Sequence, residues 1–124
     1  MINAKELRLG NFIYQGNDVI TVTDLQFDGR MYFINCYRDE GFKPISITEE
    51  WLTRGGWKWN EECKSYEHKD HIRMSLKYVD VSNSYTMYNH VLQALIAKRI
   101  WYVHQLQNLY FTLTGEELVL ESKP

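Results

Sequence analysis

Residues 101–118, with the sequence WYVHQLQNLYFTLTGEEL, form the longest stretch that predicts a helix with a defined end. Its apolar side chains recur at the spacing of one helix face, namely Val103, Leu106, Leu109, Tyr110 and Leu113. Gly115 stands where a residue just past a helix takes the left-handed conformation. Because a helix of about three turns is marginal by itself, we expect this face to pack on a sheet.

The same helix carries polar side chains beside its apolar face, namely His104, Gln105, Gln107 and Asn108. One interpretation is a recognition surface, because amide groups both donate and accept hydrogen bonds and suit base edges or a peptide backbone. The other is structural: His104 and Asn108 lie one helical turn apart, and they would hydrogen-bond locally and cap the junction with a preceding strand. The pattern favours the second interpretation and leaves the first open.

Short β-branched or aromatic runs separated by Gly and Asp turns fill the first part of the chain. They lie at residues 19–23, 31–37 and 43–47, after a looser alternation over residues 7–14. This spacing is typical of a small curled sheet, such as an SH3-like barrel. Cys36 falls inside the second run, where we expect a small core residue.

A short helix is predicted over residues 48–54. Thr48 suits its N-cap, two acidic residues follow in the first turn, and Gly55 and Gly56 end it.

A second β region follows this helix. Residues 57–59 and 66–68 are expected to pair across a polar turn. Residues 71–78 alternate most cleanly, with Ile72, Met74, Leu76 and Tyr78 on one face and Arg73, Ser75 and Lys77 on the other. Residues 85–88 continue the sheet after a turn, whereas the apolar run 91–97 fits a strand or a helix.

The sequence therefore predicts an α+β fold with antiparallel sheets. It comprises an N-terminal SH3-like small barrel, a short central helix and a C-terminal helix packed on a sheet. We expect one domain over residues 1–124, or two small lobes at 1–47 and 48–124. The second lobe would hold the short helix, the second sheet and the C-terminal helix.

Composition limits the classes of function. The 124 residues are 44% hydrophobic and 15% aromatic, which suffices for an ordinary core. The net charge of −2 lacks the bulk positive charge of a nucleic-acid binder. The start of the chain has no apolar signal segment, and no run approaches the roughly 18 apolar residues of a membrane span. We expect a soluble cytoplasmic protein with free thiols at Cys36 and Cys63.

Motifs for metal binding or catalysis are missing from the sequence. Cys63, His68 and His71 are of metal-ligand type, but zinc needs four close ligands, and His90 and His104 are distant in sequence. No nucleophile elbow, phosphate-binding glycine loop or zinc-protease helix occurs. We therefore expect no catalytic residues, no metal and no cofactor.

Aromatic side chains are dense in the second β region. Trp57, Trp59 and Tyr88 alternate with basic residues such as Lys58 and Lys77, an arrangement that would let them stack on unpaired bases. Trp and Tyr are also enriched at protein interfaces. Because the chain as a whole is slightly acidic, we favour a protein partner over nucleic acid.

Three blocks of the chain resemble a family of small proteins from Bacteroidetes genomes, their prophages and their phages. The blocks are LRLGN at residues 7–11, PI…TEEWL…G at residues 44–55, and YVHQLQNLYFTLTGEEL at residues 102–118. The resemblance implies a mobile-element context and supplies no established activity and no catalytic residues. Residues 57–99 match no pattern of the family, so differences in function are expected there.

On this basis we expect a non-enzymatic phage or prophage accessory protein that binds a host macromolecule, preferably a protein. Inhibition of a host defence nuclease is one specific form. The alternatives are an RNA- or single-stranded-DNA-binding module and, third, an enzyme of unrecognised type.

Overall fold

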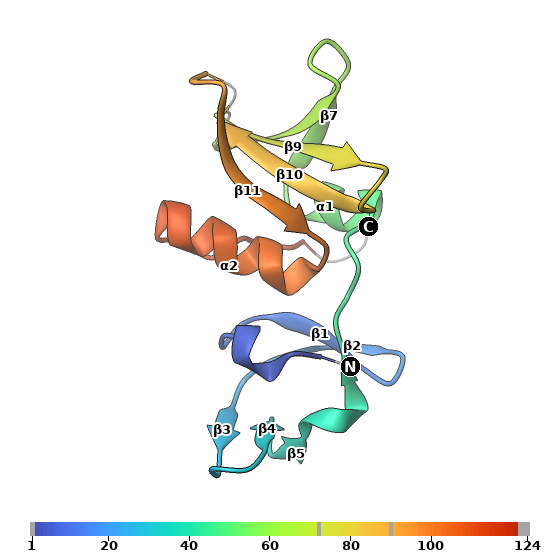
Figure 1. Ribbon diagram of the computed structural model, residues 1–124, viewed down its shortest axis with the longest axis vertical. Helices are drawn as coiled ribbons and strands as arrows, with labels where there is room; N and C mark the ends of the chain where they lie inside the picture. Colours follow the sequence, from blue (N-terminus) through green and yellow to red (C-terminus); the bar gives the residue numbers. More distant parts are fainter. Residues whose placement is uncertain (1, 72, 90, 122–124) are drawn as a thin grey trace. The chain divides into compact units, whose positions relative to one another are not determined.

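The computed structural model describes residues 2–71, 73–89 and 91–121. It has the expected α+β class with antiparallel sheets (Figure 1), and the described residues form no closed barrel. The chain divides into two compact units. Unit 1 comprises Met1–Ser46 and Tyr102–Glu117, and unit 2 comprises Ile47–Trp101 and Leu118–Pro124. The C-terminal helix thus groups with the N-terminal sheets, whereas the lobes drawn from the sequence place it with the second sheet.

Unit 1 contains two three-stranded sheets and two short 3-10 helices. One sheet has the order β2-β1-β6, from β1 (Phe12–Gln15), β2 (Asp18–Thr21) and β6 (Phe42–Lys43). The other has the order β3-β4-β5, from β3 (Leu25–Phe27), β4 (Tyr32–Ile34) and β5 (Tyr37–Arg38). The 3-10 helices are η1 (Ala4–Glu6) and η2 (Asp39–Gly41). One hydrophobic core lies among these sheets and η1. It consists of the buried residues Ile2, Ala4, Leu7, Ile13, Val22, Ile34 and Phe42.

The predicted strand over residues 31–37 is in fact a hairpin. Asn35 and Cys36 have φ angles of 50° and 70°, and they join β4 to the antiparallel β5. Two successive positive φ angles match the twist of a two-residue hairpin loop. The expectation that Cys36 is a core residue was therefore wrong: its thiol is exposed at the tip of this loop.

The predicted C-terminal helix is α2 (Val103–Thr114), which contacts β1 in unit 1. Val103, Leu106 and Tyr110 are buried as predicted. Gly115 has φ 75° and donates its N–H to the carbonyl of Phe111 at 2.8 Å, which confirms the left-handed cap.

The buried face of α2 is nevertheless rotated from the predicted one. Leu113 is 44% exposed, whereas His104 and Gln107 are 1% and 2% exposed. The Gln107 amide is bonded through both its oxygen and its nitrogen, whereas His104 bonds through Nε2 and its buried Nδ1 has no hydrogen-bond partner among the described residues.

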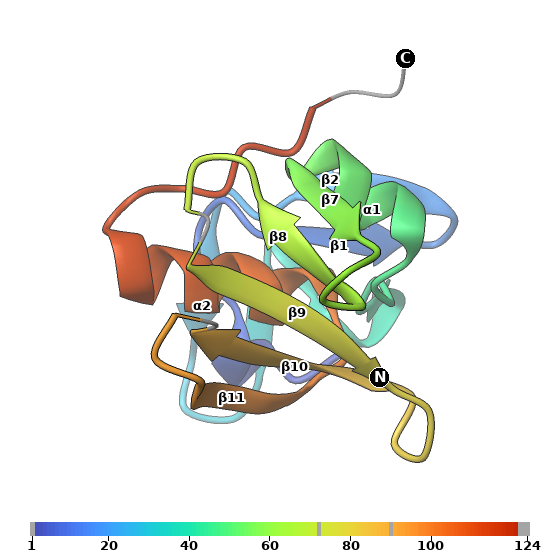
Figure 2. The same cartoon turned by 90° about the horizontal axis from the view of Figure 1, so that it is seen from above.

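Unit 2 consists of α1 (Glu49–Arg54) and a five-stranded antiparallel sheet (Figure 2). The sheet has the order β11-β10-β9-β8-β7, from β7 (Trp57–Asn60), β8 (Ser65–His68), β9 (Met74–Val79), β10 (Ser84–Asn89) and β11 (Ala94–Ile100). The predicted start of α1 is confirmed, because Thr48 Oγ1 accepts the N–H of Trp51 at 3.3 Å. The ambiguous run 91–97 contributes to strand β11.

The strand register assigns side chains to the two faces of this sheet. Trp59 pairs with Tyr66, Tyr66 with Leu76, and Leu76 with Met87, so these four residues share one face. Tyr88 follows Met87 and lies on the opposite face, in a row with Ser75, Glu67 and Lys58. We call the two sides the Trp59 face and the Tyr88 face.

Strand β9 departs from the predicted alternation. Met74 and Leu76 are buried as expected, but Ser75 is also buried and Tyr78 is 47% exposed. The predicted member Ile72 lies outside the described residues. Burial here depends on position along the strand, because the start of β9 is covered on both faces and its end on neither.

Candidate functional site

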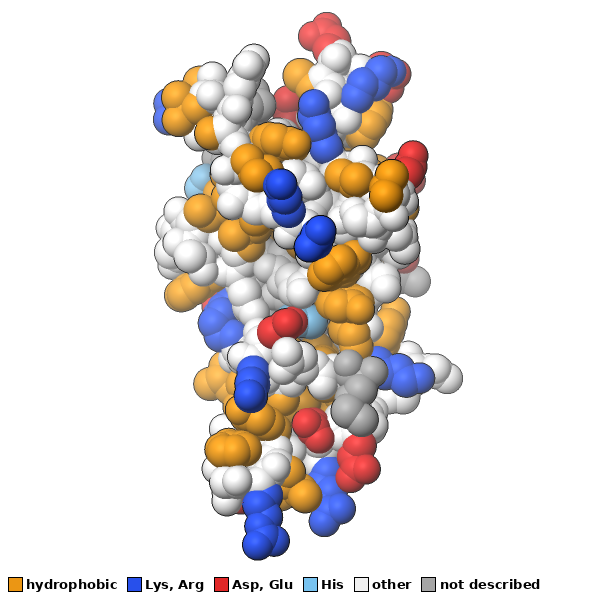
Figure 3. All heavy atoms as spheres, in the orientation of Figure 1, with side chains coloured by type: hydrophobic (Ala, Val, Ile, Leu, Met, Phe, Trp, Pro, Cys, Tyr) orange, Lys and Arg blue, Asp and Glu red, His pale blue; other side chains and the backbone are white. Residues whose placement is uncertain are grey.

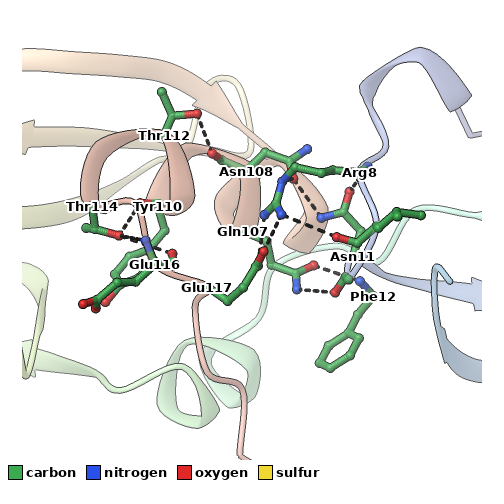
Figure 4. A network of polar contacts seen from close by, with 12 residues as sticks. Arg8, Asn11, Phe12, Gln107, Asn108, Tyr110, Thr112, Thr114, Glu116 and Glu117 are labelled. Atoms are coloured by element: carbon green, nitrogen blue, oxygen red, sulfur yellow. Dashed lines mark hydrogen bonds and ion pairs between the residues drawn. The ribbon is translucent and has the colours of Figure 1, made fainter.

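The amide of Gln107 bonds to backbone groups at the start of β1 (Figure 4). Its Oε1 accepts the N–H of Phe12 at 2.8 Å, and its Nε2 donates to the carbonyl of Gly10 at 3.1 Å. One side chain thus satisfies both a donor and an acceptor of the main chain, as a neighbouring strand would.

Asn108 makes a second set of contacts to the same loop. Its Oδ1 accepts from Asn11 Nδ2 at 2.8 Å and from Arg8 Nε at 3.2 Å, and its Nδ2 donates to the carbonyl of Glu6 at 2.7 Å. Arg8 also forms an ion pair with Glu117, whose carboxylate pKa is lowered by that guanidinium. The guanidinium of Arg8 lies 4.3 Å from the centroid of the Phe111 ring.

His104 and Gln105 bind the carboxylate of Glu6. His104 Nε2 donates to Oε1 at 3.2 Å, and Gln105 Nε2 donates to the same oxygen at 3.4 Å. Gln105 Oε1 also accepts the N–H of Tyr102 at 3.1 Å, which caps the helix. Burial lowers the pKa of His104, although Glu6 opposes this shift.

The polar stripe of α2 therefore serves unit 1 itself. The local interpretation named His104 and Asn108, but both bond, like Gln107, to residues about a hundred positions away in sequence. The local helix cap is made instead by Gln105. In this structure the amide groups of Gln105, Gln107 and Asn108 are engaged in hydrogen bonds within unit 1. The contacts also join the LRLGN loop at residues 7–11 to the segment at residues 102–118.

The three aromatic residues predicted to form one stacking platform are separated. Trp57 is 1% exposed and packs edge-to-face against His68, with ring centroids 5.0 Å apart, so it belongs to the core. Trp59 is 48% exposed on the Trp59 face. Tyr88 lies on the other face, where the ammonium of Lys77 is 5.7 Å from its ring centroid.

A different aromatic group forms on the Trp59 face, from Trp59, Tyr66, Tyr78 and Tyr85; we call it the aromatic surface. Trp59 meets Tyr66 edge-to-face at 5.1 Å, and Tyr78 meets Tyr85 in the same way at 5.3 Å. Burial raises the pKa of both Tyr66 and Tyr85, and the nearby carboxylate of Glu49 in α1 adds to the shift.

Tyr78 and Tyr85 belong to the aromatic-rich second β region but were not singled out as predicted site residues. A signal for them existed, because they stand symmetrically about the turn at residues 80–83 and pair across the β9–β10 hairpin. In an antiparallel hairpin such positions place their side chains together on one face.

The metal-type residues of this region do not converge. Cys63 is exposed in the β7–β8 turn. His68 is buried, with Nε2 donating to the Gly55 carbonyl at 2.9 Å and Nδ1 accepting the N–H of Asp70 at 3.2 Å. His90, which the sequence analysis considered as a distant metal ligand, lies outside the described residues. In the described part of the chain, no three Cys, His, Asp or Glu side chains are grouped to hold a metal ion.

Comparison of the chain with protein-family models, curated proteins and solved structures gives no match. Across residues 2–71, 73–89 and 91–121, no helix combines the length and apolar character required to cross a membrane.

Proposed function

We propose that this chain is a non-enzymatic binding protein that recognises a protein partner through the aromatic surface of unit 2. The observation that carries the proposal is the exposure of Trp59 and Tyr78, at 48% and 47%. Each is held by an edge-to-face partner, so little side-chain entropy is lost when a partner docks.

The charges beside this surface favour a protein over a nucleic acid. Glu61 accepts the Trp59 indole N–H at 2.7 Å, and the negative charge of Glu49 raises the pKa of Tyr66 and Tyr85 further, beyond the effect of burial. Carboxylates in these positions repel phosphate groups, whereas aromatic anchors with a polar rim are typical of protein interfaces. On the face drawn in Figure 3, basic side chains are scattered among acidic and apolar ones, without a dense basic patch.

The family resemblance supplies the context of this proposal. The blocks that carry it build unit 1 and α1, and the aromatic surface lies largely in residues 57–99, where the blocks are absent. A scaffold shared with phage proteins and a separate recognition sheet suit a cytoplasmic accessory protein that acts on a host protein. A host defence nuclease is one such target.

An affinity capture from a Bacteroidetes lysate tests the proposal. The tagged full chain is compared with Trp59→Ala, Tyr78→Ala and the double variant, with and without nuclease treatment of the lysate. We expect a captured protein that resists nuclease and is lost with the double variant. Leu113→Ala serves as the matched control, because it removes an exposed apolar side chain from unit 1. Capture that survives the double variant, or that vanishes with nuclease, contradicts the proposal.

A second candidate is single-stranded nucleic acid on the Tyr88 face, favoured by the position of Lys77 over Tyr88 and by Lys58 in the same row. Its signature is affinity that falls steeply between about 50 and about 200 mM salt, because phosphate contacts release counterions. Fluorescence anisotropy with a labelled oligonucleotide measures this, with Lys77→Gln as the variant. Under the leading proposal, no specific binding is expected at near-physiological salt.

A further inference from the structure

Unit 1 has an apolar groove where its core reaches the surface beside η1. The groove has a volume of about 280 Å³ and is lined by Ala4, Lys5, Leu7, Leu25, Gln26, Phe27 and Tyr32. Ala4 and Leu7 belong to the buried core, and Leu25 and Tyr32 pack against that core. The groove is therefore continuous with a packed interior.

The rim of the groove carries an aromatic pair, in which Phe27 is exposed and Tyr32 is partly buried. Leu25 and Phe27 face the same side of the β3–β4 hairpin as Ile34 and Tyr32, because the register pairs Leu25 with Ile34 and Phe27 with Tyr32. Ile34 is fully buried, whereas Phe27 at the open end is 57% exposed. The Phe27 and Tyr32 rings lie 4.6 Å apart at an angle of 33°, which fixes their orientation.

The charge at the groove has one sign. Lys5 is the one charged side chain in this lining, and it forms no ion pair with any other residue that the structure describes. A negatively charged ligand group placed beside Lys5 is therefore attracted to its ammonium group. The neighbouring carboxylate of Glu6 does not supply it, because it binds His104 and Gln105.

We infer that this groove binds an extended peptide segment of a protein partner, in which a large apolar side chain stands next to an acidic residue. The volume lies just below the roughly 300–1,000 Å³ of small-molecule pockets and suits one inserted side chain. The apolar side chain packs on Leu7, Leu25 and Phe27, and the carboxylate faces Lys5. The site lies in unit 1, so it is independent of the aromatic surface in unit 2.

Three blocked tetrapeptides test this inference by NMR titration of the isotope-labelled full chain. They are acetyl-Ala-Phe-Asp-Ala-amide, its Asn analogue and its Lys analogue. We expect shifts at the lining residues, with the Asp peptide binding roughly two- to fivefold more tightly than the Asn peptide, as for an exposed ion pair. Lys5→Glu is expected to invert the order, so that the Lys peptide binds best.

Phe27→Ala is expected to weaken all three peptides, and because Phe27 is largely exposed the variant should keep its fold, which a thermal melt verifies. Leu95→Ala is the matched control, because it removes an exposed apolar side chain from unit 2, and it should leave the titrations unchanged. The inference is overturned if the three peptides bind equally, if Lys5→Glu leaves their order unchanged, or if no shift appears at millimolar peptide.

Discussion

The Gln107 amide bonds to two backbone groups, the Phe12 N–H and the Gly10 carbonyl, as the main chain of a neighbouring strand would. Replacing it by Ala leaves both backbone groups without this partner in a partly buried setting. We expect Gln107→Ala to lower the free energy of unfolding by about 1–3 kcal/mol. Gln105→Ala, which removes an exposed contact and a helix cap, should cost less. Urea unfolding of the two variants measures the difference, and equal losses would contradict the role given to Gln107.

Two buried histidines make the fold sensitive to acid. Burial lowers the pKa of His68 and of His104 below the value of about 6.5 in the unfolded chain. Between the folded and the unfolded pKa values the unfolded chain therefore binds more protons, so stability is present above about pH 6.5 and falls as the pH drops below it.

We therefore expect the melting temperature to fall as the pH is lowered from about 7.5 to about 5.5. His104→Gln keeps a donor for Glu6 but takes up no proton, so its melting temperature should depend less on pH. A series of calorimetric melts for the two proteins measures both slopes. A variant with the same slope as the parent would rule out His104 as a contributor.

At the scale of the element, α2 shows what periodicity predicts and what it misses. The apolar spacing located the helix, and Gly115 located its end. The spacing did not give the orientation, because the partners of His104 and Gln107 come from residues 6–12, far away in sequence. Local periodicity treats a buried, fully bonded amide as a surface residue.

This rotation of α2 separates two leucines that the sequence treats alike. Leu106 is 3% exposed and Leu113 is 44% exposed. We expect Leu106→Ala to cost about 2–5 kcal/mol as a large-to-small core change. Leu113→Ala should change stability by no more than about 0.5 kcal/mol, as is usual for surface positions. Thermal melts of the two variants measure both changes in stability. Similar losses of stability would mean that Leu113 is buried, as the sequence predicted, and would contradict the rotated face.

Turn signals were the most reliable guide in unit 2. The Thr48 cap, the Gly55-Gly56 stop and the hairpin turns all lie where the sequence places them, because each depends on a few adjacent residues. The proposed binding surface could not be predicted in this way. Trp57 and Trp59 share a face, yet one is core and the other is exposed, and their coverage by other elements is not encoded in strand alternation.

For the whole molecule, the three sequence blocks at residues 7–11, 44–55 and 102–118 contribute to the packing of unit 1 and α1. The first and last blocks meet in the network around Asn108, and the middle block supplies the cap and core residues of α1. Residues in these blocks therefore help to hold unit 1 and α1 together. The exposed aromatic residues Trp59 and Tyr78 lie outside the blocks.

Unit 1 consists of two segments, residues 1–46 and 102–117, that are separated in sequence by most of unit 2. From this arrangement we expect an order of folding. Ser46 bridges to Tyr102, so unit 1 is complete only after the intervening segment has closed as a loop. Closing a long loop costs entropy, and distant contacts slow folding. The sheet of unit 2 needs only hairpins between successive strands and should form first.

The chain carries its own probes for this order. All four tryptophans, at positions 51, 57, 59 and 101, lie in unit 2, whereas the longer helix α2 lies in unit 1. In stopped-flow refolding we expect the tryptophan signal to precede most of the helical signal in far-ultraviolet circular dichroism. A single shared rate would mean that the two units fold together. During synthesis the loop at residues 7–11 must likewise wait, without its partner, until residues 104–117 have been made.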